Sequence, residues 1–557
     1  MSRSSQELES LALGPVPILN HFLGRLRLEE IFRRGLSGRE RRRKLDSARA
    51  LGVFVRNMLV SRQPLYALPE WAAGFVPEAL GLRRGEGAHL NDDRVGRCLD
   101  QLFDSDRAAL LTSFVLRMVE EFDLRLDVLH NDSTTVPFTG TYRRKGRAGS
   151  LRILHGHSKD HRPDLKQLLF EMTVTEDGAV PVLVGLHDGN VTDDRTHLGT
   201  WKTLRPIVGR PDFIYVADSK LCVTDTMSYI DGQKGRFVTV LPATRREEKW
   251  FKTWIQTHVV PWEEVFRRPP LRRRKDPPDV FRGFESPLPS AEGYRILWYH
   301  SSIKHTIDQQ ARQTRIERAV AELEFLVHRL GVRFLKTVPQ VRKAAWKILE
   351  EMKAERWIDI AVDEGERVDF RQAGPGRPGR NTEYRRISRP KPKLTWRLKQ
   401  DVIDQDAKTD GLFPLITNIR AATLQQVLAW YKYQPRLEKR FEQLKTVVGV
   451  RPVFLKNVER VEGYLLLHYM AMAVEALIER ELRASMRKAH IPELPLYWEK
   501  RLCKAPTAER VHELFAPIRR HRLLEGDREL NRFHDRLSPL QRKILGLLGV
   551  SVADYAK

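Results

Sequence analysis

The chain has 557 residues, a formal net charge of +25 and an apolar content of 41%. This length exceeds what one hydrophobic core usually serves, so we expect two to four domains. The excess of cations predicts a polyanionic partner, nucleic acid before membrane; the alternative is a basic surface without such a partner. The three cysteines, Cys98, Cys222 and Cys503, are widely separated, which argues against a disulfide framework and a cysteine-based zinc site.

Two stretches bear on membrane targeting. The first residues, MSRSSQELESLALGPVPIL, lack a charged segment followed by a sustained apolar run, so we expect no signal peptide. The most apolar run, GYLLLHYMAMAVEALIE at 463–479, is interrupted and too short to cross a bilayer. Both observations predict a soluble, cytoplasmic protein that makes no membrane contact.

Residues 1–120 show the spacing of apolar side chains that is typical of helices, as in LDSARALGVFVRNMLV. The basic run GRERRRK at 38–44 lies between two of these predicted helices. A compact basic helical region suits a helix-turn-helix DNA reader, and it suits equally a helical bundle with a charged connector. We expect a helical N-terminal domain that could bind DNA ends.

From about residue 121 the pattern changes to that of strands. LRLDVLHNDSTTVPF alternates and runs into Asp132, the turn Asp177–Gly178 separates two further strand patterns, and DFIYVADSKL is a short buried strand that ends at Asp218. Three antiparallel strands followed by helix, strand, helix and strand predict the first part of an α/β core over 121–250. Asp132 and Asp218 then lie at the ends of its first and fourth strands.

Residues 251–405 interrupt this core. RRPPLRRRKDPPD at 267–279 predicts a flexible loop, and IDQQARQTRIERAVAELEFLVHRL predicts an amphipathic helix. From Arg371 to Lys399 there are ten lysines and arginines and one acid, with Tyr384 and Trp396 among them. Basic residues interleaved with aromatic ones suit single-stranded or distorted DNA, although a solvated charge run is the plainer alternative.

The core resumes after this interruption. The buried strand pattern DGLFPLITNI returns the chain to the sheet, so 406–485 is predicted to be the second part of the core. Residues 486–557 are again predicted to be helical and basic.

The stretch YKYQPRLEKRFEQLKT at 431–446 is predicted to be one helix. Seven residues along a helix bring a side chain back to within about 20° of its first direction. Tyr431, Glu438 and Lys445 therefore share one face, and Gln434 lies one turn from Glu438. A single acid thus lies on a face that otherwise suits phosphate.

Phosphodiester cleavage needs an activated water or hydroxyl and cations that neutralise charge on the phosphate. Two Mg²⁺ ions held by carboxylates supply both. Asp132, Asp218 and Glu438 are the candidate ligands. The chain holds 72 acids, however, and five of them are rivals on position: Asp160, Asp188, Asp193, Asp194 and Glu442.

A zinc-dependent hydrolase is a different interpretation of the segment HGHSKDH at 155–161. His155, His157 and His161 could lie together there, but the segment lacks a clear general-base partner. The metal that supports activity separates the two hypotheses, Mg²⁺ or Mn²⁺ for the carboxylates and Zn²⁺ for the histidines.

The order HNDSTT, YVADSKL and Y-x-x-Q-x-x-x-E-x-x-x-x-x-x-K resembles the catalytic domain of DDE transposases from bacterial insertion sequences. The last element is similar to the Tyr–Arg–Glu–Lys signature of the branch with a long insertion between its second and third acids, and 220 residues separate Asp218 from Glu438. LGPVPILNHFLGRLRLEEIF also resembles the helical N-terminal domain of these proteins. Gln434 stands where the family has Arg, so one positive charge is absent, and Arg436 or Lys439 could compensate.

The resemblance implies a ribonuclease-H-like core that cuts and joins DNA at the ends of a mobile element. On that basis Asp132, Asp218 and Glu438 hold Mg²⁺, for which Mn²⁺ can substitute. The implied phosphate contacts come from the helix, and they position the DNA without reading its sequence. These contacts are Tyr431, Gln434 and Lys445, with Arg436 and Lys439.

The implied partners are double-stranded DNA, both terminal inverted repeats and target, and a second copy of the chain, since two ends are cut together. The protein would associate with the bacterial nucleoid when it acts. Members of this branch form a DNA hairpin, which requires a flipped base held by an aromatic side chain. Trp346, Trp357 and Trp396 are candidates for that side chain. The alternative function is a non-catalytic DNA-binding protein derived from a transposase, which the intact carboxylates argue against.

Overall fold

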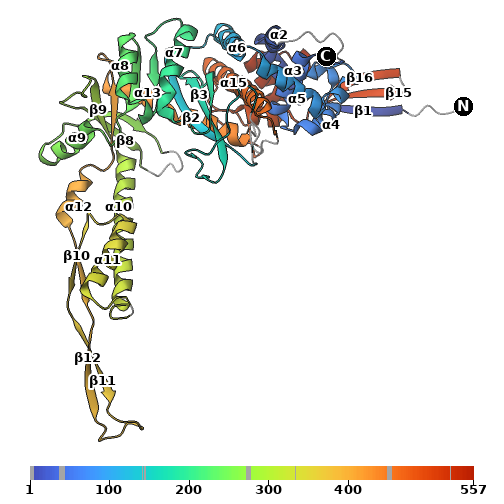
Figure 1. Ribbon diagram of the computed structural model, residues 1–557. Helices are drawn as coiled ribbons and strands as arrows, with labels where there is room; N and C mark the ends of the chain where they lie inside the picture. The colour runs from blue at the N-terminus through green and yellow to red at the C-terminus, as the bar shows by residue number, and fades with distance from the viewer. Residues whose placement is uncertain are drawn as a thin grey trace. The chain divides into compact units, whose positions relative to one another are not determined.

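The computed structural model describes residues 6–36, 44–140, 142, 146–270, 277–332, 334–447, 455–497, 499–526 and 528–556. They form two compact units: unit 1 comprises Met1–Thr239 and Leu428–Lys557, and unit 2 comprises Val240–Val427. Figure 1 shows their helices and strands. Most of the basic run at 38–44 and the middle of the predicted loop at 267–279 lie outside the described residues.

The first part of unit 1 is mainly helical, as the spacing of its apolar residues predicted. Three of its helices begin at a polar side chain, Asp46, Asn91 or Asp106, that accepts a hydrogen bond from a backbone N–H of the first turn. Such caps satisfy donors that the helix itself leaves unpaired. The helices of this part are α1 (Val16–Arg25), α2 (Leu28–Gly35), α3 (Ser47–Val60), α4 (Leu68–Ala73), α5 (Asp92–Asp104) and α6 (Arg107–Phe122).

Five strands follow the N-terminal helices in unit 1. They are β2 (Val128–Phe138), β3 (Lys166–Thr175), β4 (Pro181–His187), β5 (Ile214–Val216) and β6 (Arg236–Val240), in the spatial order β4-β3-β2-β5-β6. The strands β2, β3 and β4 are antiparallel, whereas β5 is parallel to both β2 and β6. The predicted turn at Asp177–Gly178 joins β3 to β4, with Gly178 at φ +91°.

Two helices connect the last three of these strands. Helix α7 (His197–Val208) precedes β5, and α8 (Thr224–Gly232) lies between β5 and β6. The element order therefore matches the predicted one, and unit 1 is of mixed α/β class. A parallel pair of strands needs a crossover connection of this kind.

The stretch 431–446 is not one helix, which corrects the prediction. Helix α13 (Leu424–Tyr431) ends before Lys432, α14 (Gln434–Glu442) begins after Tyr433, and a π-helical turn follows at Gln443–Val447. Pro435 lies in the first turn of α14. Because proline has no N–H and restricts the residue before it, it favours a new helix start at this point.

The longest helix of unit 1 is α15 (Val458–Lys488), which contains the apolar run at 463–479. By length and composition it could cross a membrane, contrary to the expectation from the shorter run. However, 94% of its most apolar stretch is buried inside the fold. It packs as a core helix against α3, α5 and β4.

The two ends of the chain share a small sheet that the sequence did not predict. Strand β1 (Gln6–Ala12) pairs antiparallel with β15 (Arg519–Glu525), which pairs in turn with β16 (Arg528–His534). The region predicted to be helical after residue 486 therefore contains a hairpin. Its helices are α16 (Ala508–Phe515), α17 (Pro539–Leu548) and α18 (Ala553–Ala556).

Unit 2 contains an antiparallel set of four strands in the order β14-β9-β8-β7. These are β7 (Glu263–Arg268), β8 (Asp279–Glu285), β9 (Arg295–Ser301) and β14 (Leu412–Thr417), and α9 (Arg246–Thr257) precedes them. The sequence division places β14 in the second part of the core and its boundary at residue 250 inside α9, whereas the structure groups both elements with unit 2.

The rest of unit 2 is a second layer of two helices and a ribbon. Helices α10 (Ser302–His328) and α11 (Val338–Met352) bury apolar side chains against the strands β10 (Ile358–Asp363) and β13 (Lys393–Leu398). The ribbon continues in β11 (Glu366–Gln372) and β12 (Tyr384–Pro390), and α12 (Gln400–Ala407) leads back to β14. Figure 1 shows β11 and β12 extending beyond the ends of α10 and α11.

Candidate active site

The pairing of β2 with β5 brings two of the predicted carboxylates to neighbouring positions. Leu129 is opposite Tyr215 and His130 is opposite Val216 in this parallel pair. Asp132 comes two residues after His130, and Asp218 comes two residues after Val216. Parallel strands lie about 4.8 Å apart, so the two acids belong to the same level of the sheet. Asp218 lies two residues after the last residue of β5, near the predicted strand end, whereas Asp132 lies inside the longer β2 and not at its end.

Asp218 is held at the start of a short 3₁₀ turn. Its side chain accepts a hydrogen bond of 3.0 Å from the backbone N–H of Lys220, and its Oδ1 lies 3.8 Å from Nε2 of the buried His197. Burial opposes the ionisation of Asp218. The contact with His197, the Lys220 N–H and the charge of Lys159 outweigh this effect, so the pKa of Asp218 lies below its usual value. The carboxylate is therefore ionised at neutral pH.

Tyr215 lies close to both acids from within β5. Its hydroxyl is 3.1 Å from Nδ1 of His197. Burial raises the pKa of Tyr215, and the negative charges of Glu171, Asp218 and Asp132 raise it further. The phenol thus stays neutral. The charges of both Asp132 and Asp218 act on it, which indicates that the two carboxylates lie in the same region of unit 1.

A lysine from the segment 155–161 supplies positive charge at that place. Lys159 Nζ lies 3.5 Å from Oδ1 of Asp132 and donates to the carbonyl oxygen and the hydroxyl of Ser133 at 2.7 and 2.8 Å. An ammonium group therefore lies beside Asp132, where a bound cation would also be attracted, and its charge acts on Asp218. Lys159 was not identified from the sequence, although its neighbours His155, His157, Asp160 and His161 are candidates there.

Glu438 lies on α14 and is exposed. The charges of Glu438 and Asp218 both act on Tyr431, which lies at the end of α13. Burial raises the pKa of Tyr431, and the charges of Asp218 and Glu438 raise it further. The phenol of Tyr431 is thus electrostatically coupled to one carboxylate on each side.

The three acids do not form a ready-made metal centre. Over the part of the chain that the structure describes, no group of three or more His, Cys, Asp or Glu side chains is arranged to hold a metal ion. This finding also covers His155, His157 and His161, so the histidines of the zinc hypothesis do not form such a group. The pair Asp132 and Asp218 still suits a hard cation, because both donors are carboxylates and a lysine ammonium already lies beside them.

Gln434 does not face the phosphates as predicted. It is 8% exposed, and its Nε2 donates at 3.2 Å to the carbonyl oxygen of Asn131, the residue before Asp132. This bond fixes the first turn of α14 against β2. A charged arginine would be costly to bury here, whereas a neutral amide makes the bond at little cost.

Arg436 and Lys439, which are predicted to compensate for the missing arginine, point away from Glu438. At 100° per residue they point about 160° and 100° away from Glu438 around α14. Both line a separate hollow beside Gly178 and Gln443, and the guanidinium of Arg436 lies 5.1 Å from the centre of the Tyr433 ring. Glu442, the rival one turn from Glu438, lines the same hollow.

Lys445 is the predicted phosphate contact that the structure does bring to the site. It lies in the π-helical turn, and its Nζ pairs with Oδ1 of Asp160 at 2.7 Å. Asp160 follows Lys159 in the chain. The segment 155–161 thus contains both the lysine that lies beside Asp132 and the aspartate that pairs with Lys445. Among the other rivals, Asp188 is bonded to Arg152, and the side chain of Asp193 lies outside the description.

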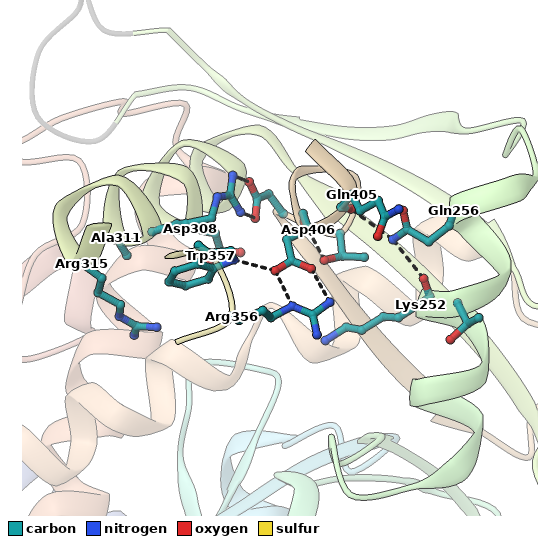
Figure 2. Close-up of a pocket in the computed structure, with 13 residues that line it drawn as sticks. Lys252, Gln256, Asp308, Ala311, Arg315, Arg356, Trp357, Gln405 and Asp406 are labelled. Carbon is teal, nitrogen blue, oxygen red and sulfur yellow. Dashed lines mark hydrogen bonds and ion pairs between the residues drawn. The ribbon is translucent and has the colours of Figure 1, made fainter. Parts of the chain in front are cut away.

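The three candidate tryptophans belong to unit 2, and only one is largely exposed. Figure 2 shows Trp357 beside a cavity of about 640 Å³, with its Nε1 donating to Asp406 at 2.8 Å. Trp357 is 9% exposed and belongs to the apolar core of the second layer, and Trp396 packs against the same core. Trp346 is 46% exposed on α11. A base could stack on Trp346 without unfolding, but not on Trp357.

A comparison with protein-family models matches the N-terminal part of the chain. Residues 8–116 match the family described as a domain of unknown function, DUF4277. The matched segment begins in β1 and ends within α6, so it contains none of the three candidate acids. A comparison with curated proteins found no match.

Replacing Lys159 with methionine is expected to strengthen metal binding, because the ammonium competes with a cation for Asp132 and Asp218. At an effective dielectric constant near 20, one charge at this range is worth a few kcal/mol, so the Mn²⁺ concentration that gives half of the maximal rise in melting temperature should fall by at least about tenfold. Thermal melting at increasing Mn²⁺ measures this. The matched variant Lys439→Met, on the far side of α14, should behave as the unchanged protein. Equal responses of both variants would show that Lys159 does not occupy the cation position.

Proposed function

We propose that this protein is a metal-dependent transposase that binds the ends of its mobile element and cuts and joins DNA. The observation that carries the proposal is the placing of Asp132 and Asp218 at one level of two parallel strands, with the charge of Lys159 acting on both. Glu438 reaches the same charge cluster through Tyr431. The order of three antiparallel strands followed by two parallel ones supports a ribonuclease-H-like core.

In this function the candidate residues would have separate roles in metal binding and phosphate contact. Asp132 and Asp218 would hold Mg²⁺, or Mn²⁺ in its place, and Glu438 would complete the ligands from α14. Such ions, when bound, would supply Lewis acidity for an attacking water or hydroxyl and positive charge beside the phosphate. The lowered pKa of Asp218 keeps a negative ligand available at neutral pH. Tyr431, on which the charges of Asp218 and Glu438 act, would orient the phosphate, and Lys445 would contact it after leaving Asp160.

The partners follow from the same proposal. The net charge of +25 favours binding to double-stranded DNA, both at the inverted repeats of the element and at its target. Two ends cut together require two copies of the chain on the DNA. Such a protein would work in the cytoplasm, at the nucleoid.

A non-catalytic DNA-binding protein is the second candidate function. The observation that favours it is that Asp132, Asp218 and Glu438 are not gathered into a three-ligand group within the described residues. Metal and DNA binding would have to draw Glu438 inward in the first candidate function, whereas no such movement is needed in the second.

Cleavage of a labelled duplex that carries the element's own ends distinguishes the two functions. We expect the unchanged protein to nick this duplex in Mg²⁺ or Mn²⁺, but not with a chelator or with Zn²⁺ alone. The Asp218→Asn variant should bind the duplex equally well and fail to nick it. Binding without nicking in every metal would identify a DNA-binding protein, and nicking by Asp218→Asn would remove the two-carboxylate site from the mechanism.

A further inference from the structure

The ribbon of unit 2 changes character halfway along its length. In the half formed by β10 and β13, Ile358, Val362 and Leu394 are buried against α10 and α11. In the half formed by β11 and β12, no residue is buried. We call this second half, residues 366–390, the arm. A two-stranded ribbon with no buried face is at best marginally stable in water, so a surface kept in this form indicates a binding partner.

The arm places arginines directly opposite one another. Arg367 is paired with Arg389, and Arg371 with Arg385, in the antiparallel register of β11 and β12. Opposite residues project from the same side of a ribbon, so these four arginines share one face. Like charges directly opposite destabilise a strand pair by themselves. An anionic partner on that face would remove this cost.

The arm contains little negative charge to balance these cations. Between residues 366 and 390 there are seven arginines and three carboxylates. Within the described residues, Arg367 is the arginine of the arm that has a carboxylate partner, Asp369 at 2.8 Å. The basic face therefore remains available to an external anion.

The other face of the arm has a different composition. Phe370 and Tyr384 are 66% and 53% exposed there, and Arg386 is opposite Phe370. These two rings could stack on bases in single-stranded DNA. The four arginines of the first face outnumber these two rings. The arginines form two rows along the two strands, and this arrangement suits a partner with two phosphate backbones.

We propose that the arm lies in the major groove of duplex DNA with its arginine face toward the DNA. The major groove is about 12 Å wide and admits a two-stranded ribbon, whose strands are about 4.8 Å apart. From there the guanidinium groups reach the phosphates on both sides of the groove. The groove of duplex RNA is too deep and narrow for this contact. The inference deepens the proposed function and rests on it for the choice of DNA as partner.

The test compares two triple variants of the full-length protein on a duplex of mixed sequence. The arm variant carries Arg371→Gln, Arg385→Gln and Arg389→Gln, and the control variant carries Arg318→Gln, Arg342→Gln and Lys343→Gln on the exposed sides of α10 and α11. Each phosphate contact contributes about −0.9 to the slope of log K against log salt. The arm variant should therefore lose up to about 2.7 of that slope and bind at least about tenfold more weakly, while the control variant changes much less.

A second measurement needs no variant. The bond between Arg380 and Asn381 lies at the tip of the arm and is open to trypsin. Duplex DNA should protect this bond at least about tenfold, whereas duplex RNA and single-stranded DNA should not. Protection by single-stranded DNA alone would overturn the inference in favour of the aromatic face.

The outcomes separate this inference from the proposed function. Nicking by the unchanged protein, together with equal salt slopes for both variants, would contradict the proposed DNA contact of the arm. The transposase function would then still stand. Binding that depends on the arm, without nicking, would support the proposed DNA contact of the arm and contradict the transposase function. A protein that binds no duplex at all would overturn both. The control variant should melt at the temperature of the unchanged protein, because its substituted side chains are exposed. The arm variant should melt no lower, because it removes charges that repel one another across the strand pair.

Discussion

The Glu438→Gln variant is expected to nick DNA at least about a thousandfold more slowly than the unchanged protein, while it binds the duplex equally well. An amide has the size of the carboxylate but lacks its charge, so it is a poor ligand for Mg²⁺. Losing one charged ligand from a two-metal site is worth several kcal/mol in the transition state, and about 4 kcal/mol corresponds to this factor. Single-turnover nicking with saturating protein measures the chemical step directly.

Glu442→Gln is the matched control, because it makes the same change one turn further along α14. Glu442 lines the hollow that contains Arg436 and Lys439, whereas the charge that acts on Tyr431 together with Asp218 is that of Glu438. We therefore expect Glu442→Gln to nick within about threefold of the unchanged rate, a difference of less than 1 kcal/mol. If Glu442→Gln is inactive and Glu438→Gln is not, the metal ligand is the residue one turn along.

Replacing Arg440 with methionine is expected to lower the free energy of unfolding by about 1.5–3 kcal/mol, because the buried Glu479 loses the closer of its two arginine partners and keeps Arg483 at 3.3 Å. Arg440 is on α14, and its Nη2 pairs with Oε2 of Glu479 on α15 at 2.9 Å, with both side chains less than a tenth exposed. The same guanidinium donates to the carbonyl oxygens of Gly178 and Ala179 in the β3–β4 turn. It therefore joins α14 to two other elements of unit 1.

The neighbouring Glu475 makes Arg440 more important. Burial and the nearby Glu479 raise the pKa of Glu475 to about 8, so Glu475 is largely neutral at pH 7. Glu479 is then the acid of this pair that needs a cation, and Arg440 and Arg483 are its two arginine partners.

Denaturant unfolding followed by circular dichroism measures the effect of Arg440→Met. The control Arg436→Met, on an exposed position of the same helix, should cost less than about 0.5 kcal/mol. The double variant Arg440→Met and Glu479→Met should be more stable than Arg440→Met alone, because no unpaired charge remains buried. A loss below about 1 kcal/mol for the single variant would show that the ion pair does not hold α14 in place.

The strands and their acids could be predicted because their signals are local. The alternation around Asp132 and the short apolar run before Asp218 each identify a strand within ten residues. The parallel pairing that brings these two residues level follows from the order of elements, since a helix lies between β4 and β5. These features needed no knowledge of distant contacts.

The predictions that failed depend on contacts between distant segments or on one local exception. Pro435 divides the expected helix, so Tyr431 and Glu438 lie on different helices. Burial of Gln434 depends on Asn131, and the position of Lys159 depends on Asp132 and Ser133. Helical spacing alone does not show which face of α14 meets the sheet, and for this reason Arg436 and Lys439 were assigned to the site.

The pairing of β1 with β15 has a consequence for how the protein is made. A ribosome delivers β1 before β15, and at usual rates of synthesis roughly half a minute to two minutes separate these paired strands. Unit 2 is one continuous segment and can fold while synthesis proceeds. Unit 1 must wait, because α14 and β15 are encoded after unit 2. The residues of the proposed active site can therefore come together only after α14 has been synthesised.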